Sequence, residues 1–304
     1  MSTGRSGAVA RSRAEPLTVL SVMLQSADYL ASKGIESARL DAEHMLAHVL
    51  GVGRLEMYLQ HERPMLESEL DGFRPLLRRR ANREPLQYIL GRQAFRELDL
   101  EVGPGVLIPR PETERLCEVV LEWADGRDAL EALDVGTGSG AIALSLLTEG
   151  PFSRCVGTDV SADALEFASR NREAAGMASR LELRRGRLFE PVKEGEAFDV
   201  VVSNPPYVAE TERGGLQAEV IDFEPEEALF AGPDGLDAVR DIVPGTAEVL
   251  REGGLFAVEL GHGQADAVVQ LVERDGRYRD VRVHEDLAGK RRIVSAIGAQ
   301  TMKS

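Results

Sequence analysis

Short apolar runs alternate with helical spacings along the chain from residue 112 onward. The runs predict buried strands, because strands covered on both faces read as continuous hydrophobic segments. They are residues 132–135, 155–158, 181–184, 198–203, 255–260, 278–283 and 292–296. Between most of them, apolar residues recur every three or four positions, which predicts helices. This alternation predicts an α/β fold with a doubly wound, seven-stranded, mostly parallel sheet. The last two runs lack a full helix between them and are expected to form an antiparallel edge.

A different pattern precedes this region. Residues 15–85 show helical spacing alone, which predicts a small N-terminal helical bundle with short loops. Its last helix is expected over residues 65–82, with a break or kink near Gly72 and Pro75, because both residue types disfavour helix interiors.

The remaining boundaries follow from these two patterns. Residues 86–111 are expected to link the two regions through a β-hairpin, in which strand 95–102 pairs with residues near 106–108. Residues 112–298 are expected to form the α/β domain. The ends of the chain are expected to form tails, the first of them disordered, at residues 1–14 and 299–304.

Composition and charge narrow the classes of function. The chain is 43% apolar and 29% charged, and no apolar run approaches the ~18–20 residues of a membrane span, so no membrane segment is expected. The net charge is −15, and residues 1–110 hold 15 Lys and Arg against 14 Asp and Glu, so the excess acid lies in the α/β region. Such a domain would repel a phosphate backbone, and direct nucleic-acid binding is not expected. Cys117 and Cys155 lie far apart, which favours a reducing compartment and predicts no cysteine metal site.

A glycine-rich stretch follows the first predicted strand, with the sequence Asp134-Val135-Gly136-Thr137-Gly138-Ser139-Gly140-Ala141. Such a loop lets the backbone approach a ligand closely at the N-terminus of a helix. Its Gly-x-Gly-x-x-Ala spacing fits a dinucleotide fingerprint, whereas Gly-x-Gly-x-Gly after an acidic strand residue suits S-adenosyl-L-methionine. Both interpretations require an acid at the end of the next strand to hold ribose hydroxyls, and Asp159 is that acid.

The strand predicted at residues 198–203 is followed by Asn204-Pro205-Pro206-Tyr207. In an open α/β sheet, chemistry lies just beyond the carboxyl ends of the strands. The two prolines fix φ and lack an N–H, so this backbone is rigid and presents carbonyls. The Asn204 amide oxygen and the Pro205 carbonyl give two acceptors beside the Tyr207 ring, which suits a planar –NH2 group. A plain strand-ending turn is the alternative, and the glycine loop and Asp159 at other strand ends favour the functional interpretation.

These motifs carry a resemblance to a known family. The tetrad at residues 204–207 resembles the class I methyltransferases that methylate planar amino groups. With four further segments, residues 15–298 resemble the protein glutamine-N5 methyltransferases that modify peptide-chain release factors. These segments are residues 84–91, 106–114, 231–236 and 286–292.

The resemblance implies a class I methyltransferase sheet and an S-adenosyl-L-methionine cofactor. It implies catalytic roles for Asn204, Pro205, Pro206 and Tyr207. It implies cofactor binding by Gly136, Thr137, Gly138, Ser139, Gly140, Asp159, Leu188 and Asn204. The implied reaction is N5-methylation of the glutamine in the Gly-Gly-Gln motif of class I release factors, which the helical N-terminal domain would recognise. A monomeric, cytoplasmic enzyme without a metal is expected.

One position departs from the family pattern. The family has an acidic residue followed by a bulky one after the third strand, where the adenine is covered. Here that site reads Gly186-Arg187-Leu188-Phe189. Arg187 replaces the acid, which leaves Leu188 or Phe189 to give an apolar cover.

Other functions stay open at this point. Methylation of a ribosomal-protein glutamine would use the same core motif, and adenine-N6 methylation of DNA or RNA would use the same pocket for a flipped base. A dehydrogenase would explain the glycine loop and Asp159 but not the tetrad. A non-catalytic binding protein would leave both motifs without a role.

Overall fold

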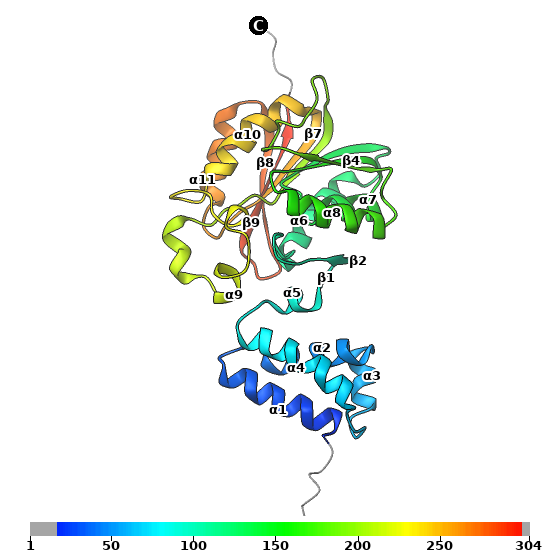
Figure 1. The fold of residues 1–304 in the computed structure, drawn as a ribbon. Helices are drawn as coiled ribbons and strands as arrows, with labels where there is room; N and C mark the ends of the chain where they lie inside the picture. The colour runs from blue at the N-terminus through cyan, green and yellow to red at the C-terminus, as the bar shows by residue number, and fades with distance from the viewer. Residues whose placement is uncertain (1–16, 300–304) are drawn as a thin grey trace, which may run out of the picture. The chain divides into compact units, whose positions relative to one another are not determined.

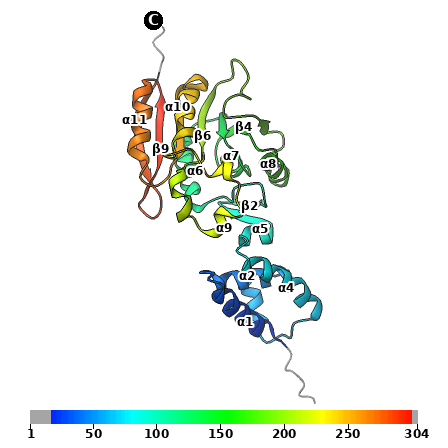
Figure 2. The same ribbon diagram turned by 60° about the vertical axis from the view of Figure 1, so that its left-hand side comes forward.

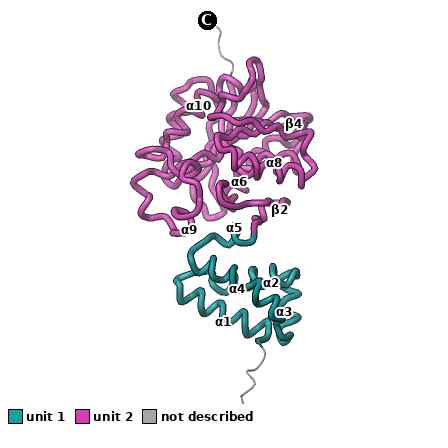
Figure 3. The backbone as a smooth tube through the Cα atoms, viewed as in Figure 1, with its two compact units in different colours: residues 1–90 teal, residues 91–304 magenta. Residues whose placement is uncertain are grey.

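The computed structural model in Figure 1 describes residues 17–299. The predicted N-terminal tail therefore lies outside the described residues, as does the C-terminal tail beyond Ala299. The chain divides into two compact units, residues 1–90 and 91–304 (Figure 3). The division falls within the segment predicted as a linker.

The first unit is a bundle of helices. Thr18 begins its first helix as an N-cap: its Oγ1 accepts the Ser21 N–H at 3.2 Å, and Ser21 Oγ accepts the Thr18 N–H at 2.8 Å. Apolar side chains from all the helices meet in one core, so the predicted bundle is confirmed. The helices are α1 (Val19–Ser32), α2 (Ala38–Leu50), α3 (Arg54–Leu59), α4 (Glu67–Ala81) and α5 (Leu86–Leu90).

Two details of the bundle differ from the prediction. Helix α4 is continuous through Gly72 and Pro75, so the predicted break is wrong. Proline removes one backbone donor, but α4 buries Leu70 and Phe73 in the bundle core, and this burial favours an unbroken helix. The short helix α5 was not predicted, because its five residues are too few to show a helical period.

The second unit begins with a β-hairpin formed by β1 (Arg92–Phe95) and β2 (Leu98–Glu101). A hairpin is predicted here, but its expected partner is wrong, since β1 and β2 pair with each other and residues 106–108 form no strand. Val106 and Ile108 are buried within an irregular segment. Two buried apolar residues separated by a half-buried one imitate a strand pattern without strand pairing.

The remainder of residues 91–299 is built on a seven-stranded sheet in the order β5-β4-β3-β6-β7-β9-β8 (Figure 1). Strands β5, β4, β3, β6 and β7 are parallel, and β9 is antiparallel to both β7 and β8. Helices α6, α7 and α8 cover one face and α10 and α11 the other (Figures 1 and 2). The predicted doubly wound sheet with an antiparallel edge is confirmed. The strands are β3 (Leu130–Val135), β4 (Phe152–Asp159), β5 (Leu181–Arg185), β6 (Phe198–Ser203), β7 (Leu250–Glu259), β8 (Tyr278–Glu285) and β9 (Arg291–Gly298). The helices are α6 (Pro111–Ala124), α7 (Ala141–Glu149), α8 (Ala162–Ala174), α10 (Asp237–Val249) and α11 (Ala265–Asp275).

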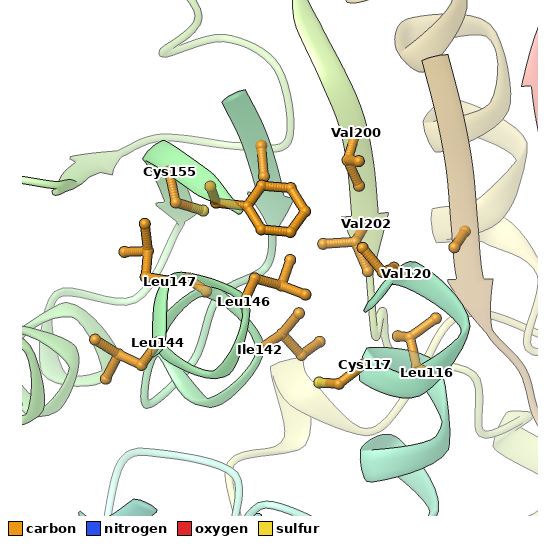
Figure 4. Packing of buried hydrophobic residues seen from close by; sticks show 14 of the residues in the cluster. Leu116, Cys117, Val120, Ile142, Leu144, Leu146, Leu147, Cys155, Val200 and Val202 are labelled. Atoms are coloured by element: carbon orange, nitrogen blue, oxygen red, sulfur yellow. The ribbon is translucent and has the colours of Figure 1, made fainter. Parts of the chain in front are cut away.

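Strand β6 shows why the central strands read as continuous apolar runs. Val200 and Val202 share a core cluster with Leu116 of α6 and Ile142 of α7 (Figure 4), while Val201 belongs to the cluster that includes α10 and α11. Successive side chains of a strand point to opposite faces, so both faces of β6 are buried.

The register of the central strands brings their carboxyl ends to one line. Val135 of β3 pairs with Thr158 of β4 and with Ser203 of β6, and Ser203 pairs in turn with Val258 of β7. The residues that follow these positions therefore lie next to one another along the carboxyl edge of the sheet. They are Gly136, Asp159, Asn204 and Glu259.

A long irregular segment joins β6 to α10 and returns to the residues that follow β6. Gly235 lies near its end with a φ of 73°, and a Cβ at this position would be 2.2 Å from the Tyr207 carbonyl oxygen. Only glycine permits both this conformation and this approach to a neighbouring backbone. The segment contains η1 (Glu210–Gly215), α9 (Ala218–Ile221) and η2 (Glu226–Ala228).

Replacing Gly235 by alanine is expected to destabilise the fold more than the same change at Gly253. Gly253 has nearly the same φ, 74°, but a Cβ there would meet no atom within 4 Å. Gly253→Ala should lower the free energy of unfolding by ~1–2 kcal/mol, the cost of the left-handed conformation. Gly235→Ala should lower it further, because the Tyr207 backbone must move. Denaturant unfolding of both variants measures the difference, and equal losses would show that the backbone contact has no energetic effect.

Candidate active site

A cavity of about 410 Å³ lies at the carboxyl edge of the sheet, within the size range of small-molecule sites. Most of the predicted site residues come together around it. Those that line it are Gly136, Thr137, Gly138, Ser139, Asp159, Leu188, Asn204 and Pro206. The predicted residues outside this lining are Gly140, Pro205 and Tyr207.

Asp134 of β3 hydrogen-bonds to the glycine loop from the buried side. It is fully buried, and its Oδ2 accepts the Thr137 hydroxyl at 2.7 Å and the Ala143 N–H of α7 at 3.3 Å. Burial raises the pKa of Asp134 to about 7, and the two hydrogen bonds act against this increase. One carboxyl thus ties the loop to the first turn of the following helix.

The three loop glycines all have positive φ, but their surroundings differ. A Cβ on Gly136 would meet no atom, and one on Gly138 would lie 4.0 Å from Val106, so both leave backbone open to the cavity. Gly140 caps α7 instead, and a Cβ there would lie 3.5 Å from the Cβ of Ala168. Its φ of 83°, a left-handed conformation, explains why glycine occupies this position.

Asp159 ends β4 at the edge of the cavity. Its Oδ2 accepts the Gly138 N–H at 2.9 Å, and its Oδ1 accepts the Ser161 N–H at 2.9 Å. Burial raises the pKa of this carboxyl above its ordinary value, while the backbone bonds lower it. The side chain is therefore held beside the glycine loop as a pair of acceptors.

The position of Arg187 clarifies the departure from the family pattern. Arg187 lines the cavity, and its guanidinium pairs with Asp241 of α10 at 2.6 Å. Leu188 lines the cavity with a φ of 48°, and its carbonyl accepts the Thr158 hydroxyl at 2.9 Å. Phe189 packs against Gly245 of α10 instead, so Leu188 is the residue that supplies the apolar wall.

Asn204 presents its amide to the cavity in one orientation. Its Nδ2 donates to Thr113 Oγ1 of α6 at 2.9 Å, and its Oδ1 accepts no hydrogen bond within residues 17–299. Pro205 is buried behind it. Tyr207 is held by its carbonyl, which accepts the Gln264 side-chain amide at 2.9 Å, and burial raises the pKa of its hydroxyl to about 12.

Two further walls of the cavity come from irregular segments. Residues 105–109 form one wall and residues 225–232 another. Glu224 and Arg110 connect the ends of these two segments: Glu224 is 5% exposed, and its Oε1 accepts the Arg110 guanidinium at 2.6 Å. Sequence analysis did not identify the second wall.

The signal for the second wall lies in the glycines of residues 231–236. Gly232 has a φ of 78°, a left-handed conformation that favours glycine, and a Cβ there would fall 1.9 Å from the Asp237 carboxyl. Thr113 was also missed as a partner of Asn204, since 91 positions separate the two residues.

Within residues 17–299, no group of three or more His, Cys, Asp or Glu could hold a metal ion, and no helix is long and apolar enough to cross a membrane.

Several known proteins are similar to this chain in sequence. Residues 22–91 match the PrmC N-terminal domain, and residues 114–226 match the methyltransferase small domain. The release factor glutamine methyltransferase of Geobacter sulfurreducens is 44% identical over 277 residues, which cover 91% of this chain and 95% of that protein. Proteins of the same name from Moorella thermoacetica and Mycolicibacterium smegmatis are 41% and 42% identical, covering 92% and 88% of this chain and 98% and 93% of theirs.

Among solved structures, a methyltransferase from Pyrococcus furiosus has a TM-score of 0.50 and 21% identity, covering 68% of this chain and 92% of that chain. This likeness supports the fold. The family matches confirm the predicted methyltransferase class and its S-adenosyl-L-methionine cofactor. On this evidence the chain belongs to the release factor glutamine methyltransferase family.

Proposed function

We propose that the chain transfers a methyl group from S-adenosyl-L-methionine to the amide nitrogen of the glutamine in the Gly-Gly-Gln motif of class I peptide-chain release factors. The observation that carries this proposal is the position of Asn204. Its amide oxygen is an unengaged acceptor in the same cavity as the glycine loop and Asp159. We further propose that the enzyme works as a cytoplasmic monomer, with its helical unit recognising the release factor and without direct contact to nucleic acid.

The residues around the cavity fit the cofactor. Gly136 and Gly138 leave backbone open to a ligand at the N-terminal end of α7. In this proposal Asp159 accepts ribose hydroxyls and Leu188 covers the adenine, which is supported by the presence of both residues in the cavity lining. When bound, S-adenosyl-L-methionine supplies a methyl group on positively charged sulfur, which is electrophilic without further activation.

The tetrad orients the substrate nitrogen. An amide nitrogen is a weak nucleophile because its lone pair is delocalised, so its geometry and its developing charge must both be controlled. Asn204 Oδ1 and the Pro205 carbonyl would accept its two N–H groups, and Tyr207 would pack against the substrate side chain. Pro205 and Tyr207 lie outside the cavity lining, so Asn204 is the member of the tetrad on which the proposal rests.

A methyl-transfer assay with labelled S-adenosyl-L-methionine tests this function. The substrates are a release factor, the same factor with its Gly-Gly-Gln glutamine replaced, a ribosomal protein mixture and duplex DNA. Label on the intact release factor alone is the expected result. Label on the ribosomal mixture or on DNA would keep the chemistry of the pocket and overturn the proposed partner.

Asn204→Ala is expected to lower the turnover number by about 100-fold or more, because it removes an acceptor that holds the substrate amide. The loss should exceed any change in cofactor affinity, which calorimetry measures separately. Thermal unfolding of the variant checks that the fold is intact. A turnover number within threefold of the unmodified enzyme would remove Asn204 from the reaction.

Asp159→Asn is expected to weaken S-adenosyl-L-methionine binding by about tenfold or more, since hydrogen bonds to a charged acceptor contribute more than those to a neutral one. Asp163→Asn is the matched control. It removes the same charge nearby in the first turn of α8, but Asp163 does not line the cavity. Titration calorimetry compares the two dissociation constants, and equal weakening would attribute the effect to charge alone.

A further inference from the structure

Gln264 lies between β7 and α11, directly before the first residue of the helix. Its side chain makes no capping bond to α11. Instead, its Oε1 accepts the Gly261 N–H at 2.8 Å, and its Nε2 donates to the Tyr207 carbonyl at 2.9 Å. Nε2 also lies 3.3 Å from the carbonyl oxygens of Asp234 and Gly235. One side-chain amide thus joins the turn after β7, the last residue of the tetrad and the end of the segment that leads to α10.

The chemistry of these partners determines how the Gln264 amide is oriented. The Gly261 backbone presents a donor, and the three carbonyls present acceptors. A side chain that satisfies them all must accept at one atom and donate from another, which a primary amide does. A carboxylate would place a second acceptor against the carbonyl oxygens, and a methionine of similar length would neither accept nor donate strongly. The oxygen of Gln264 therefore faces Gly261, and its –NH2 group faces Tyr207.

Two glycines leave room for this amide beside Tyr207. A Cβ on Gly235 would fall 2.6 Å from Gln264 Nε2 and 2.2 Å from the Tyr207 carbonyl oxygen. A Cβ on Gly261 would fall 2.9 Å from Gln264 Oε1 and 3.2 Å from Cδ2 of the Tyr207 ring. Glycine at both positions thus permits the close approach of the amide, the carbonyl and the ring.

The tetrad is tied to neighbouring elements at both of its ends. Before it, the Ser203 hydroxyl donates to the Val135 carbonyl of β3 at 2.6 Å. After it, the Gln264 amide holds the Tyr207 carbonyl. The two prolines between these ties restrict φ, so little other freedom remains in this stretch of backbone. The direction in which the Asn204 side chain leaves the backbone depends on both ties.

We propose that Gln264 is a positioning residue that fixes the Tyr207 end of the tetrad for methyl transfer. It does not line the cavity, so it acts through Tyr207 and not on a ligand. This inference rests on the proposed function, in which Asn204 and the Pro205 carbonyl orient the substrate nitrogen. Loss of the tie would let the end of the tetrad move, and a smaller fraction of bound substrate would then be held in the reactive geometry.

The groups proposed to hold the cofactor depend on other bonds. The Thr137 hydroxyl donates to Asp134 at 2.7 Å, and the Gly138 N–H donates to Asp159 at 2.9 Å. These residues belong to β3, β4 and the glycine loop, and the Gln264 side chain bonds to none of them. A change at Gln264 should therefore affect turnover more than cofactor affinity.

Two substitutions at Gln264 and two matched controls test this role. Gln264→Met keeps the approximate length of the side chain without its hydrogen bonds, and Gln264→Glu keeps the shape but replaces the donor by an acceptor. Gln270→Met and Gln270→Glu are the controls, because Gln270 lies on α11, is exposed and does not line the cavity. For each variant, kcat and KM on the release factor, the dissociation constant for S-adenosyl-L-methionine and the thermal unfolding midpoint are measured.

At pH 8, Gln264→Met and Gln264→Glu should each lower kcat by about tenfold or more, the effect of losing one orienting hydrogen bond. Their affinities for S-adenosyl-L-methionine should stay within threefold of the unmodified value. Both Gln270 variants should keep kcat within threefold, because they change the same helix without touching the tetrad.

The pH dependence of Gln264→Glu separates a hydrogen bond from packing. A protonated carboxyl has one O–H and one carbonyl oxygen, so it can donate to Tyr207 and accept from Gly261 as the amide does. Nearby carbonyl oxygens disfavour the ionised form, which raises the pKa of the introduced carboxyl. The kcat of this variant, divided by that of the unmodified enzyme at the same pH, should rise about threefold or more from pH 8 to pH 6. The same ratio for Gln264→Met should stay constant.

The division removes titration that both enzymes share. The titratable groups of the segments joined at Gln264 are the same in both, and they are Tyr207, Asp234, Glu259, His262 and Asp266. A rise in the ratio therefore reports the introduced carboxyl.

Four results would overturn the positioning role. They are a normal kcat for Gln264→Met, equal losses at positions 264 and 270, a loss confined to cofactor affinity, and a ratio for Gln264→Glu that does not change with pH. If Gln264→Met does not fold, the pH dependence of Gln264→Glu decides the question. If Gln264→Glu does not fold, the two methionine variants decide it.

Failure of this role and failure of the proposed function give different results. A failed positioning role leaves the unmodified enzyme active on the release factor, whereas a failed function leaves it inactive there. In the second case the same variants are measured on whichever glutamine or adenine substrate the enzyme labels, since both present a planar –NH2 group.

Discussion

The pairing of Val135 with Thr158 on one side and with Ser203 on the other determines where the groups of the site lie. A shift of one residue in this register would turn every side chain of a strand to the opposite face, and both faces here are packed against helices. The Ser203 hydroxyl adds a buried bond of 2.6 Å to the Val135 carbonyl at the end of the pairing. The glycine loop, Asp159 and Asn204 are thus placed by the packing of the sheet, before any ligand is considered.

The same constraint explains how much of the fold could be predicted from the sequence. Continuous apolar runs such as residues 198–203 are typical of strands buried on both faces, so they indicated the central strands well. Val106 and Ile108 misled the prediction because burial against loops produces the same apolar pattern as burial in a hairpin. Pro75 misled it in the opposite direction, since the burial of Phe73 in the bundle favours a continuous helix.

The residues of the candidate site also differ in whether the sequence could predict them. Gly136, Gly138 and Asp159 could be predicted, because the spacing of residues around a strand end reflects a local geometry. Thr113 could not, because its hydrogen bond with Asn204 depends on which strands and helices are neighbours in space. Sequence patterns identify residues whose role depends on a short stretch of backbone. Partners supplied by other elements require the topology of the sheet.

Buried carboxylates give the cavity its rigidity and much of its electrostatic character. Asp134 hydrogen-bonds to the glycine loop and Glu224 pairs with Arg110, and the pKa of each carboxyl is raised first of all by burial. Desolvating an acid is unfavourable unless hydrogen bonds or ion pairs compensate, so both groups favour the arrangement of their partners that provides them. Acidic side chains also outnumber basic ones in the lining, and Arg187 is neutralised by Asp241 at 2.6 Å. S-adenosyl-L-methionine carries a net positive charge, and the pairing with Asp241 compensates the positive charge that Arg187 brings to the cavity lining.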